Sequence, residues 1–336
     1  MKAVGFVKSR PIEHDESLFD VDLPDPRPLD NDLLVEIEAV SVNPADAKRR
    51  VRTAVDKPHE TPFVLGYDAV GIVRATGGAV RDFAPGERVW YAGDASRPGS
   101  YATLQCVDHR IASPAPASVS PEAAASLPLT SLTAWEMLFD RLQVPTSEAP
   151  ASLLVIGGAG GVGSITIQLA RRLTGLEVLA TASREESADW CRKMGAHQVV
   201  DHRDLVKSVR ATGRDHADYI VQYADTAQHW AAMCELVAPQ GRIGTIVETT
   251  EAVDISALQG KSAALMWELM FTRSMFQTPD MARQGQILSR IARLVDDAVV
   301  TTTESRVLSG LSAETLKEAH RLIETGATIG KLVVKY

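Results

Sequence analysis

The sequence predicts an α/β protein with a doubly wound parallel sheet and a second, β-rich domain. The first observation is the length of 336 residues, which corresponds to roughly two domains. The second is a β-like first third punctuated by Pro and Gly, and the third is an alternation of strands and helices from Ser152 onward. Hydrophobic residues make up 45% of the chain and charged residues 23%, which excludes disordered and fibrous architectures.

The net charge limits the classes of binding partner, and the number of cysteines limits the possible disulfides. With 35 basic and 43 acidic residues, the net charge is −8. Because phosphate contacts need clustered Lys and Arg, an acidic chain without a basic block is a poor ligand for nucleic acid or an anionic membrane. Cys106, Cys191 and Cys234 are too few and too far apart for a disulfide framework, and Met1–Arg10 lacks the apolar core of a signal peptide. We expect a soluble, cytoplasmic protein.

The first third of the chain reads as a series of short strands. Runs of β-branched or alternating residues predict strands at Ala3–Val7, Leu33–Val40, Ala69–Ala75 and Arg88–Tyr91. Strands of this length and spacing favour a compact barrel or sandwich. The segment Ser113–Pro121, rich in Pro, Ala and Ser, is typical of a connector, and Pro121–Leu142 reads as helical with a break near Pro128.

The remainder of the chain alternates strands and helices. Strands are predicted at Ser152–Ile156, Glu177–Thr181, Val199–Val200, Tyr219–Val221 and Ile243–Val247. Helices are predicted at Ser164–Leu173, Glu186–Met194 and about His229–Val237, the last ending at Pro239-Gln240-Gly241. This order is typical of parallel βαβ units. Further on come an amphipathic helix past Met281, a helix from the N-cap Ser312 to Gly326, and a strand at Gly330–Val334.

One glycine-rich motif carries a chemical prediction. Between a predicted strand and a predicted helix, the pattern G-x-G-x-x-G is matched by Gly158, Ala159, Gly160, Gly161, Val162 and Gly163. Gly158 would make the tight turn, Gly160 would let the backbone approach a pyrophosphate, and Gly163 would allow close helix–sheet packing. The pyrophosphate would lie at the helix N-terminus, where N–H groups and the helix dipole favour anions. The alternative is a glycine-rich turn that binds no ligand.

The end of the following strand predicts which dinucleotide is bound. A site for NAD usually places Asp or Glu there, about 20 residues after the glycines, to accept from the ribose 2′-OH. This chain has Thr181, Ala182, Ser183 and Arg184 at that point, with no acid before Glu185. Because a guanidinium can bind a 2′-phosphate bidentately, we predict NADPH as the cofactor. The alternative is that Ser183 only caps the next helix and Arg184 is solvated.

Further motifs follow one another along the whole chain. They are Val42-Asn43-Pro44-Ala45-Asp46, Gly66-Tyr67-Asp68-Ala69-Val70-Gly71, Pro85-Gly86-Glu87-Arg88-Val89, Leu132-Thr133-Ala134-Trp135, Gly195-Ala196 and Gly330-Lys331. With the glycine turn, they make the chain resemble the medium-chain dehydrogenase/reductase superfamily, and most of all its zinc-independent quinone oxidoreductase branch. The resemblance implies a GroES-like β-barrel substrate domain over residues 1–128, rejoined by 277–336, and a Rossmann domain over 129–276.

The resemblance also allows the metal sites to be checked. Zinc alcohol dehydrogenases of this superfamily have Cys where this chain has Asn43, and His-Glu where it has Tyr67-Asp68. Catalytic zinc needs thiolate, imidazole or carboxylate donors, so only Asp68 would remain. The structural zinc lobe with four cysteines would follow Tyr91, where only Cys106 appears. We therefore expect no metal and disfavour a zinc-dependent alcohol dehydrogenase.

The resemblance implies an NADPH-dependent reduction of quinones or α,β-unsaturated carbonyls. Such acceptors are already activated, so their reduction depends less on a Lewis acid than the reduction of a ketone does. Asn43 and Tyr67 are the candidates to line the carbonyl pocket, with interdomain packing as the alternative. Thr133 would approach the nicotinamide, and Val247, at the end of a strand, would contact the cofactor. A non-catalytic NADPH-binding sensor or structural protein is a second hypothesis. Family analogy implies a homodimer.

One stretch has no assigned role. Residues 266–276 are rich in Met and aromatic side chains. Such side chains suit a pocket for planar apolar acceptors. A buried helix or a dimer contact would have the same composition, so the sequence leaves these three interpretations open.

Overall fold

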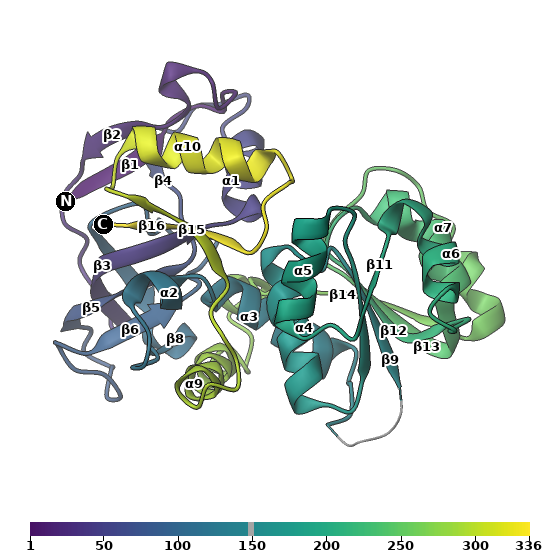
Figure 1. The fold of residues 1–336 in the computed structure, drawn as a ribbon. Helices are drawn as coiled ribbons and strands as arrows, with labels where there is room; N and C mark the ends of the chain where they lie inside the picture. Colours follow the sequence, from purple (N-terminus) through teal and green to yellow (C-terminus); the bar gives the residue numbers. More distant parts are fainter. Residues whose placement is uncertain (147–150) are drawn as a thin grey trace. The chain divides into compact units, whose positions relative to one another are not determined.

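The computed structural model describes residues 1–146 and 151–336. These residues form two compact units, drawn in Figure 1: Met1–Leu129 with Phe271–Tyr336, and Thr130–Met270. The chain thus leaves the first unit after Leu129 and re-enters it at Phe271, where the sequence suggested 128 and 277.

Two sheets build the first unit. The larger has seven strands in the order β15-β16-β3-β5-β6-β8, with β7 paired to β3. Its strands are β3 (Asp32–Val42), β5 (Ala69–Thr76), β6 (Arg88–Tyr91), β7 (Leu104–Asp108), β8 (Ala112–Pro114), β15 (Glu304–Ser309) and β16 (Lys331–Lys335). The smaller sheet joins β2 (Phe19–Asp22), β1 (Lys2–Phe6) and β4 (Phe63–Val64). The predicted β-rich domain is confirmed, and β16 pairs antiparallel with β3, placing Val333 opposite Ser41.

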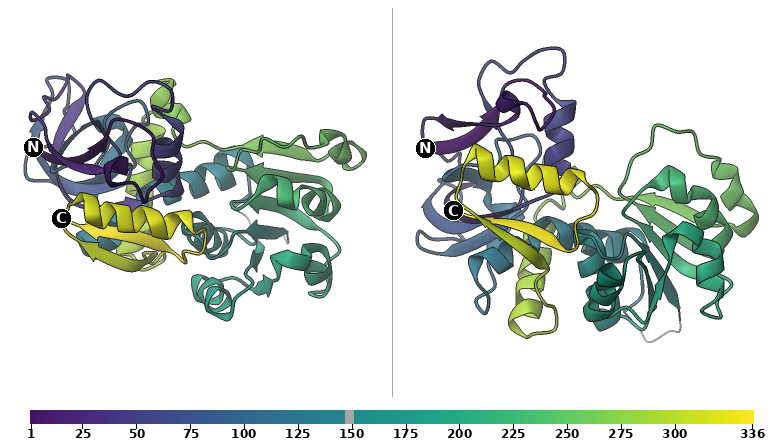
Figure 2. Two further views of the ribbon diagram at one scale, coloured as in Figure 1. Left: turned by 90° about the horizontal axis from the view of Figure 1, so that it is seen from above. Right: turned by 45° about the horizontal axis from the view of Figure 1, so that its top comes forward.

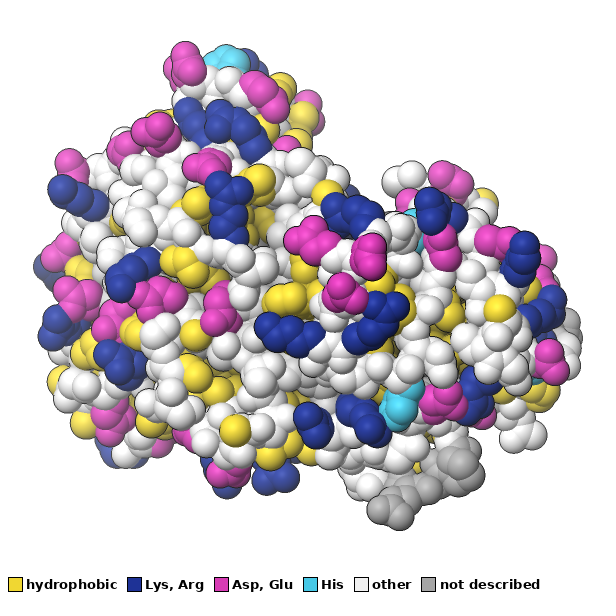
Figure 3. Space-filling model, in the orientation of Figure 1, with side chains coloured by type: hydrophobic (Ala, Val, Ile, Leu, Met, Phe, Trp, Pro, Cys, Tyr) yellow, Lys and Arg dark blue, Asp and Glu magenta, His cyan; other side chains and the backbone are white. Residues whose placement is uncertain are grey.

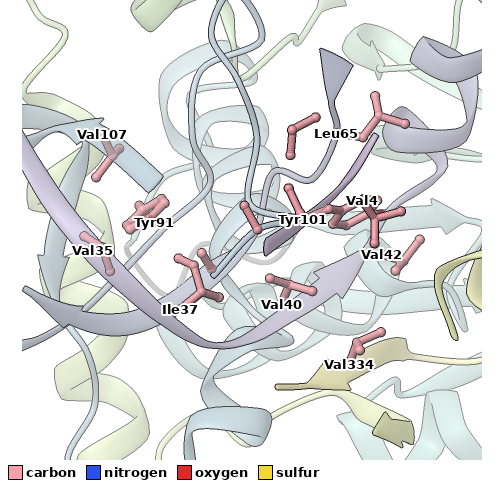
Figure 4. Packing of buried hydrophobic residues seen from close by; sticks show 14 of the residues in the cluster. Val4, Val35, Ile37, Val40, Val42, Leu65, Tyr91, Tyr101, Val107 and Val334 are labelled. Atoms are coloured by element: carbon pink, nitrogen blue, oxygen red, sulfur yellow. The ribbon is translucent and has the colours of Figure 1, made fainter. Parts of the chain in front are cut away.

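The core of this unit depends on a change of side-chain phase in β3. Val35 and Ile37 point into the apolar cluster, and so do Val40 and Val42 (Figure 4). Side chains alternate along a strand, so both pairs can face inward only because the register shifts between Ile37 and Ala39, as at a β-bulge. Each fully buried aliphatic side chain of this kind contributes about 1.5–3 kcal/mol. Because of this shift, the side chain of Ser41 points to the face of β3 opposite to that of Val40 and Val42, away from the apolar cluster.

Helices complete the first unit. They are α1 (Pro44–Arg52), α2 (Pro121–Ala125), the start of α3 (Pro128–Trp135), α8 (Thr272–Met275), α9 (Arg283–Asp296) and α10 (Ala313–Glu324). The predicted N-cap of α10 is confirmed, since the Ser312 hydroxyl accepts from the Thr315 N–H at 3.1 Å. Both views in Figure 2 show α10 (yellow) beside β16, and its buried Leu316 belongs to the core cluster of this unit.

The second unit is a doubly wound sheet, as predicted. Its six strands are all parallel, in the order β11-β10-β9-β12-β13-β14. They are β9 (Ser152–Ile156), β10 (Glu177–Thr181), β11 (Gln198–Val200), β12 (Ala217–Gln222), β13 (Val237–Thr245) and β14 (Ala264–Trp267). The helices are α4 (Gly161–Leu173) and α5 (Glu185–Met194) on one face, and α6 (Leu205–Arg210) and α7 (Thr226–Leu236) on the other (Figure 1).

The strand order fixes where ligands bind in such a sheet. From β9 the chain first winds toward β10 and β11, and then returns to place β12, β13 and β14 on the other side of β9. Loops at the carboxyl ends of β9 and β12 therefore leave in opposite directions. This switch point is where open α/β sheets bind their ligands.

Three segments differ from the predictions. A strand, β8, occupies the start of the predicted connector, and β13 runs through Pro239-Gln240-Gly241, where we predicted the end of a helix. The interpretation of residues 266–276 as one buried helix is wrong, because β14 extends the parallel sheet to Trp267. Met270 and Phe271 are buried, whereas the side chains of Trp267 and Phe276 are 52% and 73% exposed. Composition alone does not distinguish an edge strand from a buried helix.

The surface carries charges of both signs. On the face shown in Figure 3, basic and acidic side chains are interspersed over both units, in keeping with a net charge of −8. Among residues 1–146 and 151–336, no helix is long and apolar enough to cross a membrane.

Candidate functional site

The glycine turn lies at the switch point of the second unit, between β9 and α4. Gly157 has a φ of 85°, in the left-handed region that glycine adopts without strain. Its N–H donates to the Thr181 hydroxyl at 3.0 Å, which ties the turn to the end of β10. Gly160 is the N-cap of α4, so the helix begins at Gly161, three residues before the predicted Ser164. The first-turn N–H groups of α4 therefore belong to the motif itself.

The space around each glycine shows whether the packing of the fold requires a glycine at that position. A Cβ on Gly163 would lie 2.3 Å from the Gly157 carbonyl oxygen, and one on Gly158 would lie 2.8 Å from the Ala180 Cβ. Both positions therefore need glycine for the fold. A Cβ on Gly160 would meet only the Gly157 oxygen, at 3.5 Å, which is ordinary contact. Nothing in the described chain explains a glycine there, whereas close approach of a pyrophosphate to the backbone does.

Ser183 and Arg184 lie where β10 ends, at the same sheet edge as the turn, because β9 and β10 are parallel neighbours. Both residues are exposed. The N-cap of α5 is Arg184, whose N–H donates to the Ser187 hydroxyl at 3.3 Å. The alternative in which Ser183 caps this helix is therefore wrong.

Val247 lies two residues beyond the end of β13. Its carbonyl accepts from the Thr226 hydroxyl at 2.6 Å, and its N–H donates to the Thr245 hydroxyl at 3.3 Å. The same two hydroxyl groups are 2.8 Å apart. This cluster holds the loop at the carboxyl edge of the sheet and engages the Val247 N–H, so a contact between Val247 and a cofactor would use its carbonyl or its side chain. Thr133 is buried in α3.

A pair of buried carboxyl groups in the second unit was missed by the sequence analysis. Glu268 follows β14, is 2% exposed, and accepts from the Arg141 Nε at 2.7 Å. It also shares a side-chain hydrogen bond with the buried Glu136. Burial above all, and then the Glu136 carboxyl, raise the pKa of Glu268 to about 8, against the opposing effect of Arg141. Glu136 and Arg141 begin and end a π-helical turn that continues α3, a rare geometry that often accompanies function.

The first unit gathers a second polar cluster around Asn43 and Asp68, both buried. The Asp68 carboxylate accepts from the Ser41 hydroxyl at 2.5 Å, the Asn43 amide at 2.8 Å and the Leu129 N–H at 2.7 Å. The buried Lys331 ammonium donates to the Asn43 amide oxygen at 2.5 Å. Asn43 is thus engaged on both its nitrogen and its oxygen. The predicted partner of Asn43 in a carbonyl pocket was Tyr67, and its contact with Asp68 was not predicted.

Tyr67 and Asp46 lie between Asn43 and Asp68 in the sequence. The Tyr67 ring packs against Phe271 with centroids 4.5 Å apart, and its hydroxyl accepts a hydrogen bond from Arg49. Burial raises the pKa of Tyr67 well above its usual range, so the hydroxyl stays protonated at neutral pH. The Asp46 carboxyl accepts from the N–H groups of Asn43 and Gly66, at 2.8 and 3.1 Å. Burial raises the pKa of Asp46 to about 7.

The donors around Asn43 do not fit a zinc ion. An amide and a phenol replace the thiolate and imidazole that zinc prefers, and the carboxylate of Asp68 is already bound to hydrogen-bond donors. In the part of the chain that the structure describes, no group of three or more His, Cys, Asp or Glu side chains could hold a metal ion.

Comparisons with known proteins place these features in a family. The family described as "Alcohol dehydrogenase GroES-like domain" matches residues 29–117, and the one described as "Zinc-binding dehydrogenase" matches residues 194–334. A zinc-type alcohol dehydrogenase-like protein of Staphylococcus aureus is 42% identical over 99% of both chains.

Solved structures agree over the whole chain. A putative zinc-dependent alcohol dehydrogenase protein from Rhizobium etli is 46% identical, with a TM-score of 0.95 over 100% of this chain and 98% of that one. The quinone oxidoreductase from Coxiella burnetii is 26% identical, with a TM-score of 0.83 over 100% and 99%. A mycobacterial protein complexed with NADPH is 25% identical, with a TM-score of 0.84 over 100% of each. The chain therefore belongs to the medium-chain dehydrogenase/reductase superfamily, in its quinone-oxidoreductase-like branch.

Proposed function

We propose that this protein is an NADPH-dependent oxidoreductase that reduces quinones or α,β-unsaturated carbonyls without a metal. The observation that carries the proposal is Gly160, a glycine that the fold itself does not need, placed at the N-terminus of α4 at the switch point of the sheet. Some relatives have names that refer to zinc, but in this chain the donors at Asn43, Tyr67 and Asp68 do not suit that ion.

The cofactor would be held by residues of the second unit. The backbone from Gly158 to Gly163 would bind the pyrophosphate, and Ser183 and Arg184 would bind the 2′-phosphate. When bound, NADPH supplies the hydride, and the protein supplies orientation and electrostatics. Thr133 and Val247 remain candidates for contacts with the nicotinamide end.

Tyr67 is our candidate hydrogen-bond donor to the acceptor oxygen. Because its hydroxyl accepts from Arg49, the remaining O–H can donate elsewhere, and its raised pKa keeps that proton in place. A donor aimed at developing negative charge stabilises the transition state. For Asn43 we propose a positioning role, since its amide is already bound to Asp68 and Lys331.

The proposal is tested by following NADPH oxidation at the nicotinamide absorbance with a panel of simple quinones and enones. We expect acceptor-dependent oxidation of NADPH by the purified protein. Tight NADPH binding without turnover across the panel would instead support the second hypothesis, a non-catalytic NADPH-binding sensor or structural protein. Gel filtration of the same preparation tests the expected homodimer.

The choice between NADPH and NADH is tested at Arg184. We expect Arg184→Ala to weaken NADPH binding about 10- to 100-fold and to leave NADH binding unchanged, because a charge-assisted hydrogen bond contributes about 1.5–3 kcal/mol. The measurement is a fluorescence titration of each nucleotide. Arg192→Ala is the matched control, since it removes a charge from the same helix at an exposed residue paired with Asp189. Equal losses for NADPH and NADH would remove Arg184 from the 2′-phosphate site.

The role of Tyr67 is tested by Tyr67→Phe, which keeps the ring packed on Phe271 and removes only the hydroxyl. We expect kcat to fall about 100-fold with KM nearly unchanged, because the lost interaction forms mainly in the transition state. Steady-state kinetics with one quinone and one enone provide the measurement. Unchanged kcat for both acceptors would contradict the role.

A further inference from the structure

The polar cluster of the first unit contains a buried ammonium whose hydrogen-bonding capacity is filled. Lys331, the first residue of β16, is 3% exposed. Its Nζ donates to the Asn43 amide oxygen at 2.5 Å and to the Val42 carbonyl at 3.1 Å, and lies 3.4 Å from a carboxylate oxygen of Asp68. An ammonium has three N–H donors, and these three partners account for them.

The oxygen of Asp68 that faces Lys331 is surrounded by donors in the same way. This oxygen also accepts from the Ser41 hydroxyl and the Asn43 amide, while the other carboxylate oxygen accepts from the Leu129 N–H. A carboxylate oxygen offers about two lone pairs, and three donors crowd the oxygen of Asp68 that faces Lys331. That oxygen therefore has no lone pair left for an additional cation.

We propose that the Lys331 ammonium is the resident cation of this cluster, bound to Asn43 and Asp68, which stand where zinc alcohol dehydrogenases carry ligands, and that it closes the cluster to divalent ions. It neutralises Asp68, fixes the orientation of the Asn43 amide, and would repel a second cation at short range. This role of Lys331, which balances the charge of Asp68, does not depend on which acceptor the protein reduces.

The first test restores zinc donors with and without the ammonium. The double variant Asn43→Cys with Tyr67→His supplies a thiolate and an imidazole beside the Asp68 carboxylate, a donor set that suits catalytic zinc. This double variant still contains Lys331. We expect it to retain no zinc when it is dialysed first against a zinc solution and then against buffer without zinc. Adding Lys331→Met is expected to give about one zinc per chain by elemental analysis. Lys331→Met as a single substitution is the control, and this variant should bind no zinc.

Two results of that test would overturn the proposal. The first is equal zinc content in the double and triple variants, which would show that the ammonium does not exclude the ion. The second is a folded triple variant without zinc, which would show that something other than the ammonium closes the site. Stoichiometric zinc in the wild-type protein would overturn it as well.

A second measurement does not depend on the triple variant folding. Lys331→Met leaves the Asp68 carboxylate buried without its cation, so we expect the Tm to fall by several degrees. Adding Asp68→Asn removes the uncompensated charge and should restore most of the loss. If the two substitutions instead lower Tm additively, Lys331 does not neutralise Asp68 and the proposal fails.

Discussion

Replacing Gly163 with Ala is expected to destabilise the second unit strongly, whereas replacing Gly160 with Ala should leave the fold intact and weaken cofactor binding about 100-fold or more. At Gly163 the new Cβ would lie 2.3 and 2.6 Å from the backbone oxygens of Gly157 and Gly158. Neither oxygen is the end of a flexible side chain, so α4 would have to move away from β9. We expect a loss of about 3 kcal/mol or more in the free energy of unfolding.

At Gly160 the expectation is reversed. Its φ of −72° is ordinary for any residue, and the space beside it is open. Stability should change by less than about 0.5 kcal/mol, while NADPH affinity should fall about 100-fold or more, because the methyl group would occupy the place of the pyrophosphate. Thermal melts and NADPH titrations separate the two effects. Gly260→Ala, also in open space, is the control for both measurements. Undiminished NADPH binding by Gly160→Ala would remove the turn from the cofactor site.

Raising the pH from 4.5 to 8 is expected to destabilise the second unit through Glu268. In the folded protein the pKa of Glu268 is raised from its usual 4.5 to about 8. The folded state therefore holds a proton that the unfolded state releases across this range, so stability falls as pH rises and the loss is complete above pH 8. With about 1.4 kcal/mol for each pKa unit, the effect amounts to a few kcal/mol.

The measurement compares melting temperatures at pH 5, 6.5 and 8.5 for the wild type and Glu268→Gln. The variant cannot ionise, so its Tm should depend less steeply on pH. The buried Asp46, with its pKa raised from 3.8 to about 7, adds a slope of the same sign that both proteins share. Glu251→Gln, at an exposed position, is the matched control and should follow the wild type. Parallel pH profiles for the wild type and Glu268→Gln would exclude Glu268 as the source.

Local patterns determined how much of the fold could be predicted. The strands β6, β9 and β10 were predicted with their observed limits, because each is an apolar run bounded by turn residues. The helix α1 was missed, although Pro44 at its first turn and Asp46 as its capping partner are helix-start signals. The strand β14 was missed because an edge strand rich in Met and Trp shows no clear period.

The candidate site was predictable only where its parts are close in sequence. The glycine turn and the end of β10 follow from one βαβ unit. The contact between Lys331 and Asn43 joins residues 288 positions apart, and no periodicity links β16 to the start of α1. The same holds for Glu268 and Arg141, which are 127 positions apart. Such contacts arise from strand order and packing, which a single sequence does not specify.

The position of β16 in the chain has a consequence for synthesis on the ribosome. The second unit is one continuous segment, complete once Met270 has emerged, whereas the first unit lacks β16 until residues 331–335 have followed. Until then Asp68, which is wholly buried in the finished protein, has no ammonium to pair with. We therefore expect the second unit to fold before the first. Until β16 is synthesised, the N-terminal strands remain incompletely paired and prone to aggregation, because they lack the strand that carries the ammonium of Lys331.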